Sequence, residues 1–153
     1  MKRIATYAVF YMFFLIVNGC SGSDDCGDLA CFTPPANFVF DLVDKETGIN
    51  IFLSESYSPE QVTVWNKTED RKEAFGFIIE DQLYWISIQG IGWKTEKVEY
   101  EIRLDQEVIA ELYVDVERVT ANCCTFSNYN EIRLDTEEYK YLEGTDVFRI
   151  FLN

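Results

Sequence analysis

The sequence predicts an all-β domain in which two antiparallel sheets pack as a β-sandwich, with a β-barrel as the alternative. Apolar and polar residues alternate with a period of two over several segments, and turn-forming residues separate these segments. The aromatic content of 16% agrees with this class, because pleated cores favour Phe, Tyr and Trp. No segment shows the period of a long amphipathic helix.

The first strand is expected in NFVFDLVD, residues 37–44, where Phe38 and Phe40 share one face. The clearest element is a β-hairpin over residues 97–117, in which two alternating runs flank a tight turn at 105–107. Shorter strands are expected at residues 49–53, 61–66, 74–80, 82–89, 130–135, 138–142 and 146–152. So many short strands in one domain suit an immunoglobulin-like or transthyretin-like sandwich.

The N-terminus has the form of an export signal, which sets the domain boundaries. Lys2 and Arg3 supply positive charge, and an apolar run follows that is too short for a transmembrane helix of about 20 residues. We therefore expect residues 1–19 to be a cleaved signal peptide. Residues 20–36 are rich in Gly, Ser, Asp and Pro and are expected to form a flexible tether, and residues 37–153 a single β-domain.

The string LIVNGC, which ends at Cys20, resembles the bacterial lipoprotein signal. In such proteins a thioether-linked diacylglycerol is placed on the cysteine before cleavage on its N-terminal side. The resemblance implies that Cys20 is acylated and holds the chain on a membrane. The alternative is an ordinary secretory signal that leaves Cys20 as a plain thiol.

The five cysteines agree with this reading, because acylation of Cys20 leaves an even number for disulfides in an oxidising compartment. The remaining four are Cys26, Cys31, Cys123 and Cys124. Adjacent cysteines pair with each other only through a strained ring, so we expect Cys123 and Cys124 each to reach back to Cys26 or Cys31. A metal site is the competing interpretation, but the spacings do not fit a zinc ribbon and the chain has no histidine.

Three segments together resemble a group of small uncharacterised lipoproteins from Bacteroidota: CFTPP with FDLVDKETG within residues 31–48, IGWKT at 91–95, and NCCTF at 122–126. In that phylum, acidic residues after the acylated cysteine resemble a signal for export, a role that Ser23, Asp24 and Asp25 would fill. The resemblance implies a lipid-anchored outer-membrane protein on the periplasmic or the surface-exposed face, and it brings no assigned activity.

Charge and composition exclude several functions. Loss of Lys2 and Arg3 with the signal leaves 11 basic and 27 acidic residues, a formal charge of −16, which disfavours nucleic acid as a partner. Membrane contact must then come from the acyl chains, since anionic lipid would repel the domain. Without histidine there is no Ser-His-Asp or Cys-His set, so we expect no enzyme and no cofactor. The acidity favours solubility over bound calcium.

The aromatic residues suggest a binding function. Trp93, with Gly90 and Gly92 beside it in the GIGWKT loop, is the leading candidate for stacking on a sugar ring, with Tyr57 and Trp65 as weaker ones. The alternative is that these rings cap the core. We therefore expect a non-catalytic surface module that binds a glycan or an envelope protein, or that serves as an accessory subunit. A carboxylate-dependent enzyme acting on extracellular glycans and a purely structural lipoprotein are the alternatives.

Overall fold

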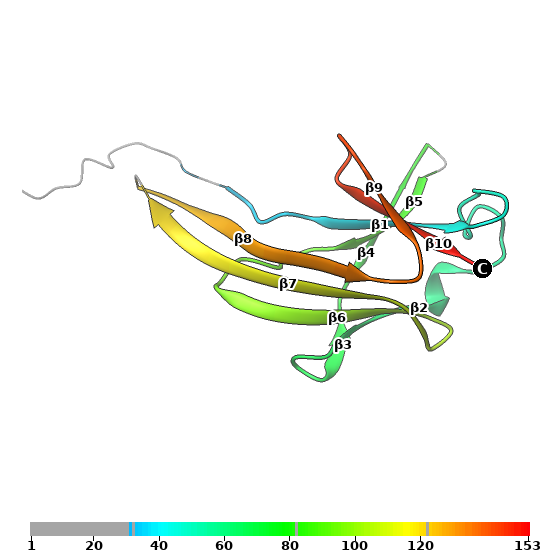
Figure 1. The fold of residues 1–153 in the computed structure, drawn as a ribbon, viewed down its shortest axis with the longest axis horizontal. Coiled ribbons are helices and arrows are strands. Elements are labelled where there is room, and N and C mark those ends of the chain that lie inside the picture. Colours follow the sequence, from blue (N-terminus) through cyan, green and yellow to red (C-terminus); the bar gives the residue numbers. More distant parts are fainter. Residues whose placement is uncertain (1–30, 32, 82, 122) are drawn as a thin grey trace, which may run out of the picture.

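The computed structural model describes residue 31 and residues 33–81, 83–121 and 123–153, and it confirms the all-β prediction. Ten strands form two five-stranded sheets, and the described part of the chain contains no helix except one 3₁₀ turn, Pro59–Gln61 (Figure 1). The expected signal peptide at 1–19, the acylated Cys20, Cys26 and most of the tether lie outside the described residues.

The first sheet has the strand order β4-β5-β1-β10-β9 and the second the order β3-β2-β6-β7-β8. The strands of the first sheet are β4 (Gly76–Glu80), β5 (Leu83–Ile88), β1 (Phe38–Asp44), β10 (Val147–Leu152) and β9 (Tyr139–Leu142). Those of the second are β3 (Arg71–Glu73), β2 (Val62–Asn66), β6 (Glu96–Leu104), β7 (Glu107–Ala121) and β8 (Cys124–Asp135).

The two sheets are not closed into a barrel, so the sandwich is the correct one of the two architectures predicted. Neighbouring strands are antiparallel with one exception. The first and last strands, β1 and β10, are neighbours within the first sheet and pair in parallel, with Val39 opposite Val147 and Asp44 opposite Leu152. This pair joins the beginning of the domain to its end.

The core follows the alternation in the sequence. Inward residues from both sheets are buried and form one cluster, whose fully buried members include Phe40, Leu42, Ile86, Ile102, Leu112 and Ile150. The outer face of β1 is buried as well. There Asp41 pairs with Arg149, at 2.8 Å between Oδ2 and Nε, and accepts a hydrogen bond from Asn50. A buried carboxylate needs such partners, because an unpaired charge away from water is costly.

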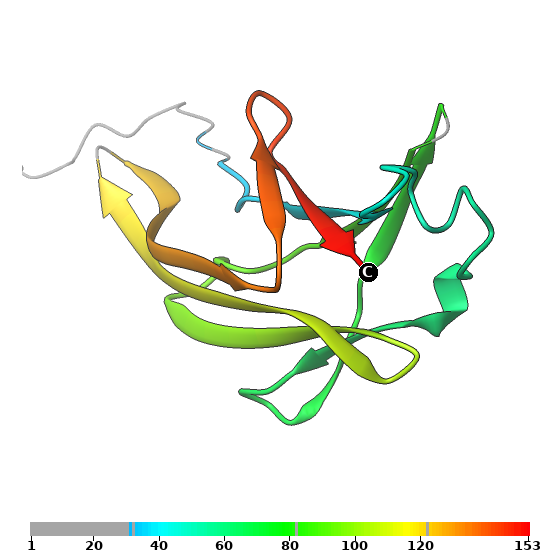
Figure 2. The same ribbon diagram turned by 45° about the vertical axis from the view of Figure 1, so that its right-hand side comes forward.

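The predicted hairpin at 97–117 is confirmed as β6 and β7, but β7 continues to Ala121 and forms a second, longer hairpin with β8. The tip of this hairpin lies at the end of the molecule opposite the C-terminus (Figures 1 and 2). A disulfide joins Cys31 to Cys124 there, and Cys123 is disulfide-bonded too. Since Cys26 is outside the described residues, the second pairing stays a prediction. A cross-link over 93 residues stabilises the fold by about 4 to 5 kcal/mol in the chain-entropy model.

The main differences from the predicted strands concern residues 49–53, the strand β3 and the start of β8. Residues 49–53 form turns with only one bridge, at Asn50, because the Asn50 side chain accepts a hydrogen bond from the Phe52 amide and so competes with sheet pairing. The edge strand β3 was not predicted, since its sequence RKE shows no alternation. In addition, β8 begins at Cys124 rather than at residue 130. No helix in the described ranges is long and apolar enough to span a membrane.

Candidate functional site

The structure places the three aromatic candidates in three separate depressions. Trp93 lines a groove between the loop after β5 and the edge of the second sheet. Trp65 lies on the outer face of that sheet, and Tyr57 lines a pocket at the end of the sandwich. The three rings therefore do not form one binding surface, and each must be judged by its own surroundings.

The loop that carries Trp93 is fixed by hydrogen bonds to the long hairpin. The Tyr129 hydroxyl donates to the Ile91 carbonyl at 3.0 Å, and the Ser127 hydroxyl donates to the Gly92 carbonyl at 2.7 Å. The Gly92 amide donates to the Glu96 carboxylate at 2.8 Å. With the Ile91 side chain buried in the core, the loop is held at several points and Trp93 projects from a rigid base.

Gly92 is required at its position for two reasons. Its φ of +104° is rarely adopted by residues with a side chain, and a Cβ there would lie 2.9 Å from the Tyr129 hydroxyl. Gly90 also has a positive φ, +91°, but a Cβ there would meet nothing within 4 Å. Both glycines shape the turn, and only Gly92 is tightly packed against the hairpin.

Arg118 connects Trp93 to the backbone that follows the disulfide-bonded Cys31. Its guanidinium lies over the indole ring, with 5.5 Å from Cζ to the ring centroid, and donates to the Ser127 hydroxyl at 2.8 Å. It also donates to the carbonyl of Thr33, two residues after Cys31. Thr33 therefore helps to hold the aromatic ring through Arg118, and the Ala36 amide, which donates to the Tyr129 hydroxyl, helps to hold the loop.

The floor of the Trp93 groove is deeply buried and carries two polar side chains beside Val98. Asn66 and Tyr100 lie opposite each other on β2 and β6, are 2% and 6% exposed, and both line the groove. The Asn66 amide donates to Glu73 at 3.3 Å and weakly to the Tyr100 hydroxyl at 3.5 Å. Burial raises the pKa of Tyr100 to about 12, and the negative charges of Glu73, Glu96 and Glu69 add to this effect. The phenol therefore stays protonated and available for hydrogen bonding.

Charged side chains line the walls of the groove, which has a volume of about 300 Å³. Arg71 pairs with Glu69 at 2.7 Å and with Glu73 at 3.0 Å, and Lys94 lies 3.6 Å from Glu96. The Arg71 guanidinium holds the pKa of Glu69 below its usual value, chiefly through their hydrogen bond. Trp93, 52% exposed, stands beside this polar lining. An exposed ring next to carboxylates and amides is the arrangement that binds sugars.

Trp65 has different surroundings. The Arg103 guanidinium lies over its ring at 5.2 Å, and Arg103 is ion-paired with Glu101 on the same strand. The other lining residues of this depression are Thr63, Lys72 and Gln106. None of them belongs to the buried polar residues of the described chain, so this depression on the outer face of the sheet has no buried polar floor.

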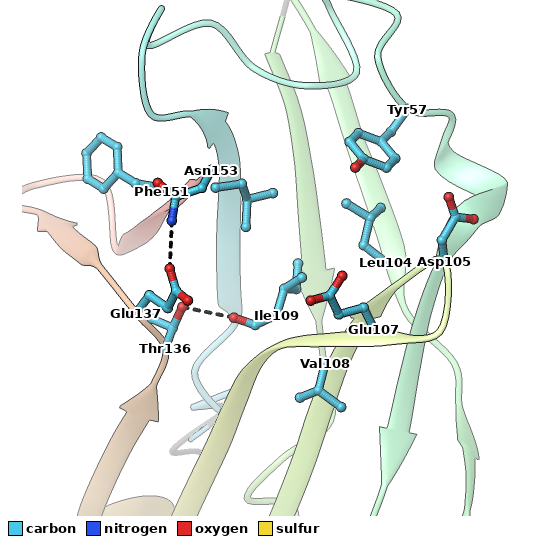
Figure 3. A pocket seen from close by; sticks show the side chains of 11 residues that line it. Tyr57, Leu104, Asp105, Glu107, Val108, Ile109, Thr136, Glu137, Phe151 and Asn153 are labelled. Atoms are coloured by element: carbon cyan, nitrogen blue, oxygen red, sulfur yellow. Dashed lines mark hydrogen bonds between the residues drawn. The ribbon is translucent and has the colours of Figure 1, made fainter.

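Tyr57 lines a pocket of about 220 Å³ at the end of the sandwich that contains the C-terminus, shown in Figure 3. Its ring lies near Leu104, and acidic side chains surround the opening: Asp105, Glu107 and Glu137 (Figure 3). Two of these carboxylates have partners. Glu137 accepts a hydrogen bond from Asn153 at 2.7 Å, and Asp105 accepts one from Gln61 at 2.6 Å.

The sequence interpretation missed the residues that build the Trp93 groove. Asn66 carried a usable signal, because it follows Val62 and Val64 at a position where alternation predicts a buried apolar side chain. Arg118, Ser127 and Tyr129 carried none, since their roles depend on how the hairpin meets a loop distant in sequence. Among the described residues, no three cysteine or acidic side chains are placed to hold a metal ion.

Comparison with known proteins adds no relative: no protein-family model, no curated protein and no solved structure matches the chain.

Proposed function

We propose that the protein is a lipid-anchored, non-catalytic module of the outer membrane that binds a glycan in the Trp93 groove. The observation that carries the proposal is the combination of an exposed, rigidly held indole with a buried polar floor. A sugar ring stacks on the apolar face of an aromatic side chain while its hydroxyls bond to polar groups beside it.

The charges in the groove support binding rather than catalysis. Glycoside hydrolysis needs a carboxylic acid with a raised pKa that donates a proton. Here Glu69 has a lowered pKa, and Glu73 is ion-paired with Arg71 and accepts hydrogen bonds from Asn66 and the Ala74 amide. Carboxylates held by such partners are suited to accept hydrogen bonds from sugar hydroxyls.

Binding is tested with the processed protein and its Trp93→Ala variant on a glycan array, followed by titration calorimetry of the glycans that bind. Loss of the stacked ring should weaken binding by about 2 kcal/mol, or roughly 30-fold. Trp65→Ala is the matched control and should leave binding within about twofold of the original. If no glycan binds, or if both variants bind as the unaltered protein does, the proposal is wrong.

The anchor is tested by Cys20→Ala in cells. The variant should leave the membrane fraction, because acyl chains supply the attachment that an acidic domain lacks. Mass spectrometry of the unaltered protein should show cleavage before Cys20 and a diacylglycerol on its sulfur. An unchanged membrane fraction for the variant would contradict the anchor and leave the glycan proposal standing.

A further inference from the structure

Resting on the proposed function, we infer that the Trp93 groove selects a sugar that carries a protonated amine over a neutral or an acidic sugar. Charge and depth in the groove carry this inference, together with the hydrogen-bonding capacity of its floor.

The charged side chains of the groove are ordered by depth. The side chains of Glu96 and Glu73 are 14% and 20% exposed, whereas those of Arg71 and Lys94 are 55% and 70% exposed. The carboxylates of Glu73 and Glu96 therefore lie inside, whereas the cations lie at the rim together with Glu69, whose side chain is 44% exposed. Because charges interact more strongly where less water screens them, the interior of the groove favours a positive group.

The raised pKa of Tyr100 also indicates a negative electrostatic potential at the floor of the groove. Negative charge on Glu73, Glu96 and Glu69 raises the pKa of Tyr100 further than burial alone, so these carboxylates disfavour a negative charge at the phenol oxygen. The same field that opposes a phenolate stabilises an ammonium group. It equally opposes the carboxylate of a uronic acid, as does the formal charge of −14 on the whole chain.

The hydrogen-bonding groups fit the same ligand. An ammonium group donates three hydrogen bonds and accepts none. The deep groups of the groove include acceptors for it: the carboxylates of Glu73 and Glu96 and the hydroxyl oxygen of Tyr100. Trp93 lines the same groove as these acceptors, so a pyranose stacked on the ring would lie beside them. Hydrogen bonds between ions of opposite charge are the stronger kind.

The test compares three oligosaccharides of equal length by calorimetry on the processed protein: a deacetylated chito-oligosaccharide, its N-acetylated counterpart and an oligogalacturonate. The titrations are made at mildly acidic pH, where the sugar amine is protonated. The amine-bearing sugar should bind at least about fivefold more tightly than the acetylated one, and this preference should shrink as salt is added. The oligogalacturonate should bind most weakly.

Two charge-removing variants test whether the preference for the amine comes from a carboxylate of the groove or from the acidity of the whole domain. Glu73→Gln should abolish the preference for the amine while binding of the acetylated sugar persists. Glu111→Gln removes the same charge from the outer face, where Glu111 pairs with Lys67, and should keep the preference. Equal affinity for the amine-bearing and acetylated sugars overturns the charge selection alone. Tightest binding of the oligogalacturonate also overturns it. Failure of all three sugars to bind overturns this inference, whereas the glycan-binding function is overturned only if no glycan on the array binds.

Discussion

Trp93 and Trp65 share a local motif and differ in everything around it. In each case an arginine guanidinium lies over the indole, at 5.5 Å for Arg118 and 5.2 Å for Arg103. Trp65 stands on a regular strand, in a depression on the outer face of the sheet. Trp93 stands on a loop that joins the two sheets, and it shares its groove with a buried amide and a buried phenol. The comparison shows that buried polar groups beside the ring, and not a depression alone, make an aromatic residue a candidate site.

The largest expected effect on the difference between Trp93 and Trp65 comes from a substitution that moves the loop carrying Trp93. In Gly92→Ala, alanine must adopt a backbone φ that residues with a side chain rarely adopt, and its Cβ meets the Tyr129 hydroxyl. The substitution should therefore lower the free energy of unfolding by about 3 kcal/mol. Glycan binding through Trp93 should be lost with it. The environment of Trp65 should stay unchanged, as followed by fluorescence in a background where Trp85 and Trp93 are phenylalanine.

Gly90→Ala is the matched control for this prediction. Gly90 has a similar positive φ but open space for a Cβ, so only the backbone strain remains and the loss should be about 1 kcal/mol. Chemical denaturation of both variants measures the difference. Equal losses for the two variants would show that packing against Tyr129 does not hold the loop.

A second test removes the polar floor that only Trp93 has. The folded protein raises the pKa of Tyr100 from 10 to about 12, so between these values it binds a proton that the unfolded chain has released. The stability associated with this proton is complete below pH 10 and falls by about 2 kcal/mol as the pH rises toward 12. Tyr100→Phe should flatten this alkaline loss, measured by denaturation at a series of pH values. A loss as steep in the variant would contradict the assignment to Tyr100.

The difference between Trp93 and Trp65 also shows which features of the molecule the sequence could predict and which it could not. The alternation of residues 97–104 and 108–116 predicted β6 and β7, because burial on one face imposes a period of two on a strand. The sequence also singled out Trp93, because Gly90 and Gly92 precede it in a loop. The sequence could not give the groove, since Asn66 and Tyr100 meet only through the register of β2 on β6. Nor could it distinguish Trp93 from Trp65, because the buried polar floor beside Trp93 depends on contacts between distant segments.

The smallest expected effect concerns the arginine that lies over each tryptophan, Arg118 over Trp93 and Arg103 over Trp65. Arg118→Met keeps an aliphatic side chain beside Trp93 but removes the hydrogen bonds to Ser127 and Thr33, so binding should weaken by about 1 kcal/mol, or roughly fivefold. Arg103→Met makes the equivalent change above Trp65 and should leave glycan affinity unaltered. Acrylamide quenching of single-tryptophan variants gives a readout that needs no glycan: quenching should rise for Trp93 in the first variant. Unchanged quenching there would mean that the loop alone, and not the cation above it, positions the ring.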